Sequence, residues 1–522
     1  MDAHRPFLVV TQSPPPRSDQ STDFMTHLKT IVSVALALIL IAGVLARAGM
    51  TRRWIEDIGS ETSTREELRV WDWWSASTNE EYGAYFAEIE RTFEAQHPNI
   101  DIIYQIVPFG NYVQKLSTAM VGDSPPDVFQ SSVYWAEGFY QRGMLRPLDD
   151  LLASESDADP GNSLAKEHFL PTAWRHNHAL DGTVFGIPQI IDASCLLWNL
   201  DILQEASSAD EELRDLFAHF PDGSIDYDRL RFDALHDWDH FRRIVDKLTI
   251  RDDDGNIERA GFVLSAYGSG AGMFSPWLAS NGGRVQDAAG TRALFASAAG
   301  VETLEFLARL YWVDRISPPF HRQMTPSELF QERKVASVTA GTWSGKDITR
   351  NSLGWTHFGK TAFPPGPSGD GPSTVTWGNM LVITRRAENV DAAWAYLKFV
   401  CGLPGSLLRS KHLGYNGPRY DFYATQRWQE ALAERPYLST VKQICLVGEK
   451  LRHTEITAVD HQANPIFESV LLHYPEIVAG DGPHESVEAA LQLAARNVDN
   501  VYARYNEQVA RWLTERRWRG QL

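Results

Sequence analysis

Near its beginning the chain changes twice between the two-residue period of a strand and the 3.6-residue period of a helix. Leu68–Trp74 is strand-like, and Thr78–Glu81 has the spacing of a helix-capping box. From Tyr82 to Phe93, apolar and aromatic residues recur at offsets 0, 3, 4, 7 and 11, which is one stripe of a helix. A second strand pattern follows in Asp101–Val107. The segment therefore predicts a βαβ unit.

Strand and helix patterns continue to alternate along the rest of the chain. A helix is predicted through Tyr112, Leu116 and Met120, and Gly182–Pro188 is predicted as a turn and an edge strand that its proline ends. The other predicted strands are Asp127–Gln130, Ser194–Trp198, Val335–Ala340 and Trp377–Thr384, and the other predicted helices are Val133–Arg142, Ala392–Val400 and Ser486–Val501. This alternation indicates an α/β fold built on a mainly parallel sheet.

Three tryptophans, Trp71, Trp73 and Trp74, stand at the end of the first predicted strand. Adjacent strand residues point to opposite faces, so the three indoles cannot all enter one core. Open α/β sheets bind ligands at the carboxyl ends of their strands, which is where these residues lie. We therefore assign Trp71 to the core and favour Trp73 and Trp74 as ligand contacts, with burial of all three as the alternative.

Composition narrows the class of protein. The 522 residues suffice for two to four domains, and a formal net charge of −18 argues against a nucleic-acid-binding protein. Seventeen tryptophans require either a large core or an aromatic-lined site. The sequence predicts neither a cofactor nor a metal site: Asp252–Asn256 lacks the alternation of a calcium-binding loop and is predicted to be a turn.

The N-terminal region has the pattern of an export signal. Ile31–Ala46 is an uninterrupted apolar run that follows Lys29 and precedes a small-residue cleavage pattern ending at Ala48. We predict that residues 1–48 form a signal peptide, with a start of translation at Met25 as one variant and an uncleaved membrane anchor as the alternative. Residues 49–67 are then a linker, and the rest of the chain is exported.

Cysteines do not organise the predicted fold. Cys195, Cys401 and Cys445 show no metal-ligand or C-x-x-C spacing, and Cys195 lies in an apolar run. An oxidising compartment would allow a disulfide between Cys401 and Cys445.

Six segments resemble, in the same order, segments of the extracellular solute-binding proteins of ABC importers. The resemblance is to the carbohydrate-type group that includes maltose-binding proteins, and it spans about residues 68–501. The six segments are Leu68–Trp74, Gly122–Val128, Gly143–Leu148, Val184–Pro188 with Leu197–Asp201, Val335–Trp343 and Gly480–Leu491. Each is weak alone, and their shared order carries the resemblance.

The resemblance implies an α/β, two-lobed periplasmic-binding-protein fold of type II, with crossing hinge strands and an interlobe ligand cleft. Lobe I is expected to comprise residues 68–191 and 335–384, and lobe II residues 192–334 and 385–522. It further implies a monomer outside the cytoplasm that captures a sugar or oligosaccharide by hinge closure and delivers it to a membrane permease without catalysing a reaction. The segment near 206–237 exceeds the family's usual length and has no predicted role.

A sugar site needs flat aromatic faces and a few planar polar groups. Position after strands, or resemblance to the family's cleft segments, selects the candidates. They are Trp73, Trp74, Ser131, Ser132, Tyr134, Trp135, Asp192, Trp277, Trp343, Trp377, Asn379 and Arg419. For Arg419 the alternative is a surface salt bridge, and for Asp192 it is a hinge hydrogen bond. For the aromatic residues and the two serines the alternative is a place in the core.

Two other functions remain open. An exported glycoside hydrolase would also be acidic and rich in aromatics, but it needs two paired carboxylates that sequence alone cannot identify. A polyamine-binding protein would need several carboxylates in the cleft, and only Asp72 and Asp192 stand at suitable places.

Overall fold

The computed structural model describes residues 65–73, 80–122, 124–155, 161–179, 182–264, 271–287, 291–317, 326–344, 355–450 and 462–518. The chain divides into two compact units, Met1–Arg65 and Glu66–Leu522. The predicted signal segment and the capping residues before Glu80 lie outside the described residues, as does Trp74. Within the described ranges no helix is both long enough and apolar enough to cross a membrane.

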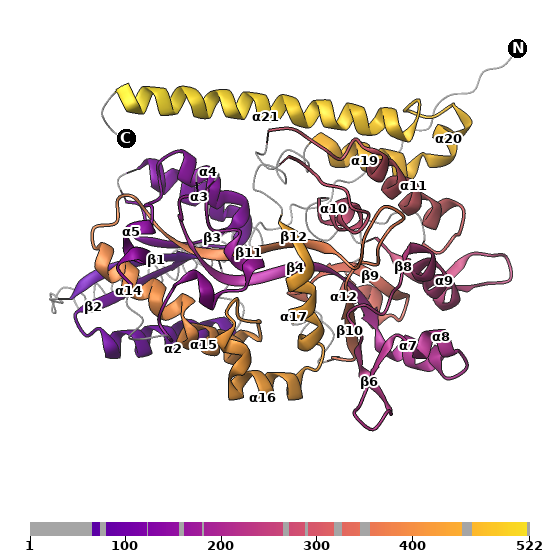
Figure 1. Ribbon diagram of the computed structural model, residues 1–522, viewed down its shortest axis with the longest axis horizontal. Coiled ribbons are helices and arrows are strands. Elements are labelled where there is room, and N and C mark those ends of the chain that lie inside the picture. Colours follow the sequence, from indigo (N-terminus) through magenta and orange to yellow (C-terminus); the bar gives the residue numbers. More distant parts are fainter. Residues whose placement is uncertain are drawn as a thin grey trace, which may run out of the picture. The chain divides into compact units, whose positions relative to one another are not determined.

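Ten of the described strands form one sheet, whose main path runs β2-β1-β3-β11-β4-β9-β8-β7 (Figure 1). The strands are β1 (Glu66–Asp72), β2 (Ile100–Ile106), β3 (Val128–Ser132), β4 (Ile187–Asn199), β7 (Ile250–Arg251), β8 (Ile257–Val263), β9 (Val335–Gly341), β10 (Phe358–Thr361), β11 (Thr374–Ile383) and β12 (Gly448–Lys450). β10 pairs with β4, and β12 pairs with β11.

The sheet is mixed, so the prediction of a mainly parallel sheet holds only in part. β1 pairs in parallel with β2 and β3, as the predicted βαβ unit requires, and β8 pairs in parallel with β9. The centre is antiparallel, because β11 runs against β3 and β4, and β4 runs against β9 and β10. The parallel pairs β1–β2 and β1–β3 on one side and β8–β9 on the other are therefore joined through β4 and β11, and β7 adds an antiparallel edge beyond β8.

Pro188 does not end a strand, contrary to the prediction for Gly182–Pro188. It is the second residue of β4, a strand of thirteen residues that are all buried. The register between β4 and β11 shifts here, from Asn379 opposite Ile190 to Met380 opposite Pro188. Proline has no N–H to donate to a sheet and is found at bulges and strand starts for that reason. The irregular pairing beside it lets β4 continue as one long central strand.

The predicted helices are present, with shifted ends. The described α-helices are α2 (Glu80–Gln96), α3 (Phe109–Val121), α4 (Val133–Gln141), α5 (Asp149–Ala153), α6 (Pro171–Trp174), α7 (Leu200–Ser207), α8 (Glu211–Arg214), α9 (Trp238–Leu248), α10 (Ala271–Ser280), α11 (Ala298–Trp312), α12 (Pro326–Gln331), α14 (Val390–Cys401), α15 (Leu403–Leu413), α16 (Gln426–Glu434), α17 (Leu438–Val447), α19 (Asn464–Leu472), α20 (Tyr474–Ala479) and α21 (Val487–Trp518). In α2 the predicted stripe is confirmed: Tyr85, Phe86, Ile89 and Phe93 are buried.

Two segments pair or pack with elements that were expected from the sequence in the other lobe. β9, expected in lobe I, is hydrogen-bonded between β4 and β8. α14 and α15, expected in lobe II, share a core with Leu68 and Val70 of β1 through Leu397 and Leu413. The 3.6-residue pattern predicted α14 to within two residues, but it carries no information on which sheet face a helix covers.

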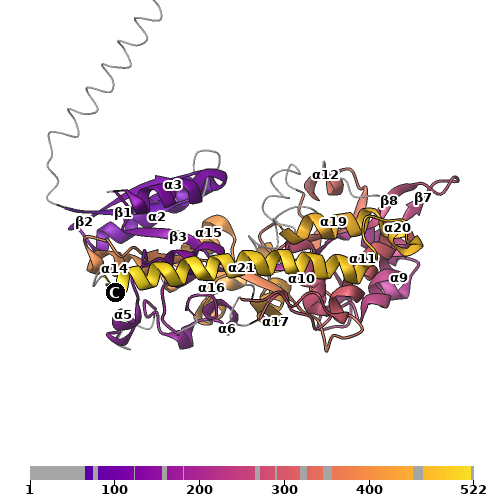
Figure 2. The ribbon, with the colours of Figure 1, turned by 90° about the horizontal axis from the view of Figure 1, so that it is seen from above.

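α21 continues to Trp518, well beyond the predicted end at Val501. Its first half packs on α11 and α19, and the views in Figures 1 and 2 agree on this. The segment without a predicted role, near 206–237, contains α8 and a separate two-stranded sheet of β5 (Phe217–His219) and β6 (Ile225–Leu230).

All three cysteines are buried and unpaired, so the Cys401–Cys445 disulfide considered above is not formed. Cys401 lies in α14 and Cys445 in α17, and these helices belong to different cores. Burial raises the pKa of the Cys195 thiol to about 11 and that of Cys401 to about 12. All three thiols are therefore small apolar core groups.

Candidate functional site

An aromatic cluster lies at the carboxyl ends of β1 and β3. Trp73 directly follows β1, and its ring centroid is 5.1 Å from that of Tyr112 and 5.3 Å from that of Trp135. Phe109, the first residue of α3, lies 6.0 Å from Trp73 and 5.7 Å from Trp135. Phe109 is 59% exposed, whereas Trp73 is 8% exposed. The cluster thus presents Phe109 and part of Trp135 to solvent, over a buried Trp73.

Tyr112 fixes this cluster to the sheet. Its hydroxyl donates to the carbonyl of Gln130 at 2.8 Å and lies 3.3 Å from the carbonyl of Trp71, so α3 is tied to both β3 and β1. Burial raises the pKa of Tyr112 well above its usual range, so the hydroxyl keeps the proton that it donates. The aromatic cluster is therefore held by a buried polar contact as well as by packing.

Polar candidates lie on neighbouring strands at the centre of the sheet. Ser132 at the end of β3 faces Asn379 of β11, and Asp192 of β4 faces Trp377 of β11. Directly opposed residues of antiparallel strands have neighbouring side chains on one face, so each pair is in contact range. Ser131 is buried opposite Met380, and its hydroxyl donates to the carbonyl of Ser132.

Trp343 and Trp377 form an indole pair beside Asp192. Their ring centroids are 5.2 Å apart at an interplanar angle of 55°, and both residues are partly exposed. Trp343 follows β9, and its ring folds back over Gly341: a Cβ on Gly341 would lie 1.8 Å from Cζ3 of Trp343. Only glycine leaves room for the indole to lie across the backbone at this point.

Asp192 is held in this site by Thr342. The Thr342 hydroxyl donates to the Asp192 carboxylate at 3.0 Å and accepts from the backbone N–H of Ala193 at 3.0 Å. Burial raises the pKa of Asp192 to about 6, although the Thr342 hydroxyl and the nearby Lys360 ammonium both favour the charged form. Asp192 is thus a 9% exposed carboxylate at the edge of the indole pair.

Trp377 belongs to the indole pair and also contacts the aromatic cluster around Trp73. It packs against the cluster that contains Trp73 and Phe129, and also against the cluster that contains Phe274 and Leu491. The structure therefore brings together one set of predicted residues around β3, β11 and β4. The members of this site are Trp73, Ser132, Trp135, Asp192, Trp343, Trp377 and Asn379, to which the structure adds Phe109.

Trp277 and Arg419 are placed elsewhere. Trp277 is 0% exposed in a core with Phe241 and Phe363, each 5.0 Å away, so it presents no face to a ligand. Arg419 is also 0% exposed; it donates to both carboxylate oxygens of Asp421 and to the carbonyl of Ser163. Resemblance to the family's cleft segments suggested both residues, but tertiary packing gives both of them structural contacts. We leave them out of the proposed site.

Two further candidates are not described. Trp74 lies outside the described residues, and the side chain of Tyr134 is also outside them, although its backbone lies in α4.

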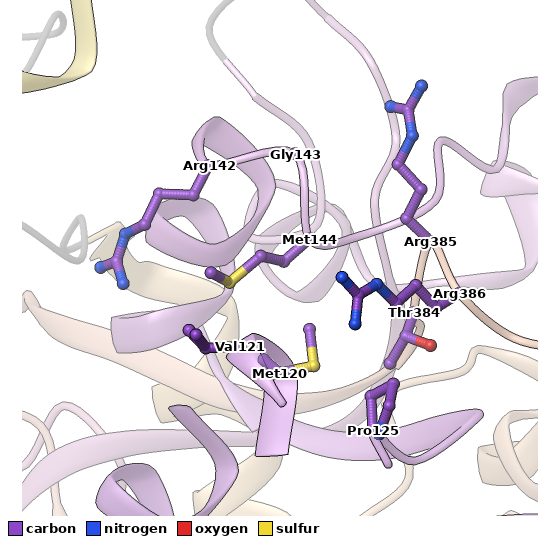
Figure 3. Close-up of a pocket in the computed structure, with 9 residues that line it drawn as sticks. All are labelled: Met120, Val121, Pro125, Arg142, Gly143, Met144, Thr384, Arg385 and Arg386. Atoms are coloured by element: carbon purple, nitrogen blue, oxygen red, sulfur yellow. The ribbon is translucent and has the colours of Figure 1, made fainter. Parts of the chain in front are cut away.

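A hollow of about 280 Å³ lies at the opposite end of β3 (Figure 3). Its lining includes Pro125, which precedes β3, and Thr384, which follows β11. In Figure 3 the Arg386 guanidinium turns toward the methionines of the lining, and Arg385 extends away from them. Arg386 donates to the carbonyl of Gly122 at the end of α3 and so satisfies a helix C-terminus. This hollow is distinct from the aromatic site at the carboxyl ends of the strands.

Over the ranges that the structure describes, no group of three or more histidine, cysteine, aspartate or glutamate side chains could hold a metal ion. The prominent contacts of the site are instead flat aromatic faces with amide, hydroxyl and carboxylate groups beside them, which is a chemistry of recognition.

Solved structures of low sequence identity share the fold. The GacH receptor of Streptomyces glaucescens matches with a TM-score of 0.60 and 20% identity, over 84% of this chain and 98% of that one. An ABC substrate-binding protein of Listeria monocytogenes in complex with cycloalternan matches with a TM-score of 0.63 and 18% identity, over 84% and 99% of the two chains. A maltose/maltodextrin-binding domain of Bdellovibrio bacteriovorus bound to maltotriose gives 0.57 and 20%, over 83% and 99%. The predicted two-lobed periplasmic-binding-protein fold is thereby confirmed.

Sequence comparison gives the family. A putative binding protein of Brucella abortus (strain 2308) is 29% identical over 124 residues, which are 24% of this chain and 28% of that protein. The match therefore spans little more than a quarter of the length of that relative. The family profile described as bacterial extracellular solute-binding protein matches residues 75–402, more than half of the chain. Members of this family bind solutes and are not enzymes. The chain belongs to the family of bacterial extracellular solute-binding proteins.

Proposed function

We propose that the protein captures a sugar or oligosaccharide outside the cytoplasm and delivers it to the permease of an ABC importer. The observation that carries the proposal is the Trp343–Trp377 indole pair beside the Asp192 carboxylate and near Asn379. Indole faces suit the apolar C–H surface of a pyranose, and carboxylate and amide groups suit its hydroxyls. The structural relatives named above support the same class, because their ligands include maltotriose and cycloalternan.

Strand connectivity supports capture by hinge closure. β4 and β11 both run through the centre of the sheet, so the elements on either side are joined by continuous strands. Bending at such strands moves two rigid groups of elements about a fixed boundary, and a ligand selects the closed state through contacts that only that state completes. Trp377, which packs against two separate hydrophobic clusters, lies where we expect such contacts to form.

Isothermal titration of the exported chain tests the proposal directly. The panel is maltotriose, cycloalternan, acarbose, spermidine and a buffer blank. We expect binding of at least one saccharide, and replacement of Trp343 by alanine should weaken it about tenfold or more, equal to ~1.4 kcal/mol. Trp312→Phe is the matched control, because Trp312 is a partly exposed indole on α11 that donates to the Leu471 carbonyl.

Three outcomes would contradict the proposal. Binding of spermidine alone would favour the polyamine reading, and release of shortened products from an oligosaccharide would favour the hydrolase reading. Saccharide binding that Trp343→Ala and Trp377→Ala leave unchanged would place the site elsewhere.

A further inference from the structure

Lys360 is a buried cation near the centre of the sheet that the sequence patterns did not single out. It lies in β10, opposite Leu197 of β4, and its relative exposure is 0%. Its ammonium donates to the carbonyl of Thr342 at 2.6 Å. It also lies 5.0 Å from the ring centroid of Tyr437 and 5.8 Å from that of Phe358. Aromatic faces and one carbonyl replace the water that the charge has lost.

Every polar group of Thr342 has a hydrogen-bond partner. Its N–H donates to the Ala193 carbonyl at 2.9 Å, its hydroxyl bridges the Ala193 N–H and the Asp192 carboxylate, and its carbonyl accepts from Lys360. We call Asp192, Thr342 and Lys360 the Thr342 anchor. These contacts join β4, β10 and the turn after β9 at a single residue.

The residue next to this anchor is Trp343, whose ring covers Gly341 and contacts Trp377. Since Thr342 and Gly341 are both immobilised, the direction in which the Trp343 side chain leaves the backbone is fixed as well. A buried charge adds little to stability compared with an apolar residue of similar size, but it can select one local arrangement over others. Lys360 is placed to make such a selection at the base of the indole pair.

We propose that Lys360, together with Asp192, is a positioning residue for the Trp343 indole: both hold Thr342, and Thr342 sets the orientation in which Trp343 meets Trp377 and the ligand. The predicted effect on ligand affinity rests on the proposed function, whereas the predicted effect on the orientation of Trp343 does not. Sugar affinity therefore depends on a lysine that does not touch the sugar.

Titration of Asp192 offers a way to loosen the anchor without mutation. Besides Thr342, the groups that face the Asp192 carboxylate are Lys360 from β10, Cys195 from β4 and Cys445 from α17. Burial raises the pKa values of both thiols, so they stay neutral over the physiological range. Protonation of Asp192, whose pKa is about 6, removes the negative charge nearest to Lys360 and weakens the acceptor of the Thr342 hydroxyl.

Circular dichroism of the ligand-free protein tests the positioning. Two indoles 5.2 Å apart give an exciton couplet, and the Trp343→Phe protein supplies the reference spectrum without this pair. We expect Lys360→Met to reduce the couplet by half or more in protein that still unfolds cooperatively. Lys115→Met is the matched control, because Lys115 is an exposed lysine 5.6 Å from the Trp71 ring and should leave the couplet unchanged.

Two further measurements keep the test decisive if Lys360→Met does not fold. Thr342→Val keeps the side-chain shape, removes the hydroxyl that joins Asp192 to Ala193, and should also reduce the couplet. The couplet of the wild-type protein should change between pH 5 and pH 7, following the Asp192 pKa of about 6. The spectrum of Trp343→Phe should not change over this range. An unchanged couplet in a folded Lys360→Met or Thr342→Val protein, or a flat wild-type titration, would overturn the proposal.

Titration with maltotriose separates this inference from the proposed function. If the wild-type protein binds maltotriose, Lys360→Met should weaken binding at least fivefold, and Lys115→Met should not. Unchanged affinity in Lys360→Met would overturn the ligand part of the inference. If the wild-type protein binds no saccharide while the couplet still depends on Lys360, the proposed function fails and the positioning of Trp343 stands.

Discussion

Substitution of Gly341 by alanine should move the Trp343 indole away from Trp377. The new Cβ would lie 1.8, 2.0 and 2.1 Å from three atoms of the Trp343 ring, whereas ordinary contact begins at 3.4 Å. The indole must rotate to relieve this overlap, because the backbone at Gly341 is held by its pairing with Ser194 of β4. Lost contact between the two indoles should cost about 0.5–1.5 kcal/mol. Overpacking should cost about 1–3 kcal/mol in addition.

The assay for Gly341→Ala combines three readouts on one sample. The exciton couplet should shrink, the free energy of unfolding in urea should fall by about 1.5–4.5 kcal/mol, and the affinity for any saccharide that binds should fall about tenfold, equal to ~1.4 kcal/mol. Gly371→Ala is the control, because a Cβ there meets nothing within 4 Å. A Gly341→Ala protein with wild-type stability, couplet and affinity would show that Trp343 does not lie over Gly341, and the geometry of the proposed site would be wrong.

Three other substitutions or treatments have defined outcomes. Trp277→Ala should lower the free energy of unfolding by about 3–5 kcal/mol by opening a cavity between Phe241 and Phe363, while ligand affinity of the folded protein stays unchanged; lost affinity at full stability would return Trp277 to the site. Asp192 binds its proton more tightly in the folded than in the unfolded protein, so its contribution to stability is present below about pH 4 and is lost as the pH rises through about 6. Relative to Asp192→Asn, the wild-type protein should therefore lose about 3 kcal/mol of unfolding free energy over that range. Parallel pH profiles of the two proteins in urea unfolding would refute this. A thiol reagent should label none of the three cysteines in the native protein and all three in denaturant, and rapid labelling of native protein would contradict their burial.

The periodicity of the sequence predicted the elements that have one solvent-exposed face and one buried face. The α2 helix is the clearest case, because its stripe from Tyr85 to Phe93 packs on the sheet while the other side meets solvent. The strand that begins at Val335 and the one that contains Trp377 were also predicted within a few residues. The six segments that resemble the family occur in the family's order, and this order led to the family.

Long-range pairing could not be predicted from the same patterns. Pro188 argues locally for the end of a strand, and only the irregular register with Met380, nearly two hundred positions further along the chain, lets β4 continue. Trp277 and Trp343 look alike in sequence, yet one is enclosed by a core and the other lies at its margin. The Thr342 anchor joins residues 150 positions apart, and no local signal announces such a contact. Phe109 could have been predicted, because it is an aromatic residue directly after a strand and a proline. Its contact with Trp73 and Trp135 could not, because only the fold brings the three residues together.

β11 also sets the order in which the protein can acquire its structure. It lies between β3 and β4 and completes the centre of the sheet, but it is synthesised only after residue 373. Sheets that depend on contacts between distant segments form slowly, because a long loop must close before any pairing is gained. A nascent chain that has not yet produced β11 therefore has no complete site and no closed sheet centre. For a protein that acts outside the cytoplasm, as we propose, this delay would keep the chain unfolded until most of it has been made, and folding would be completed after export.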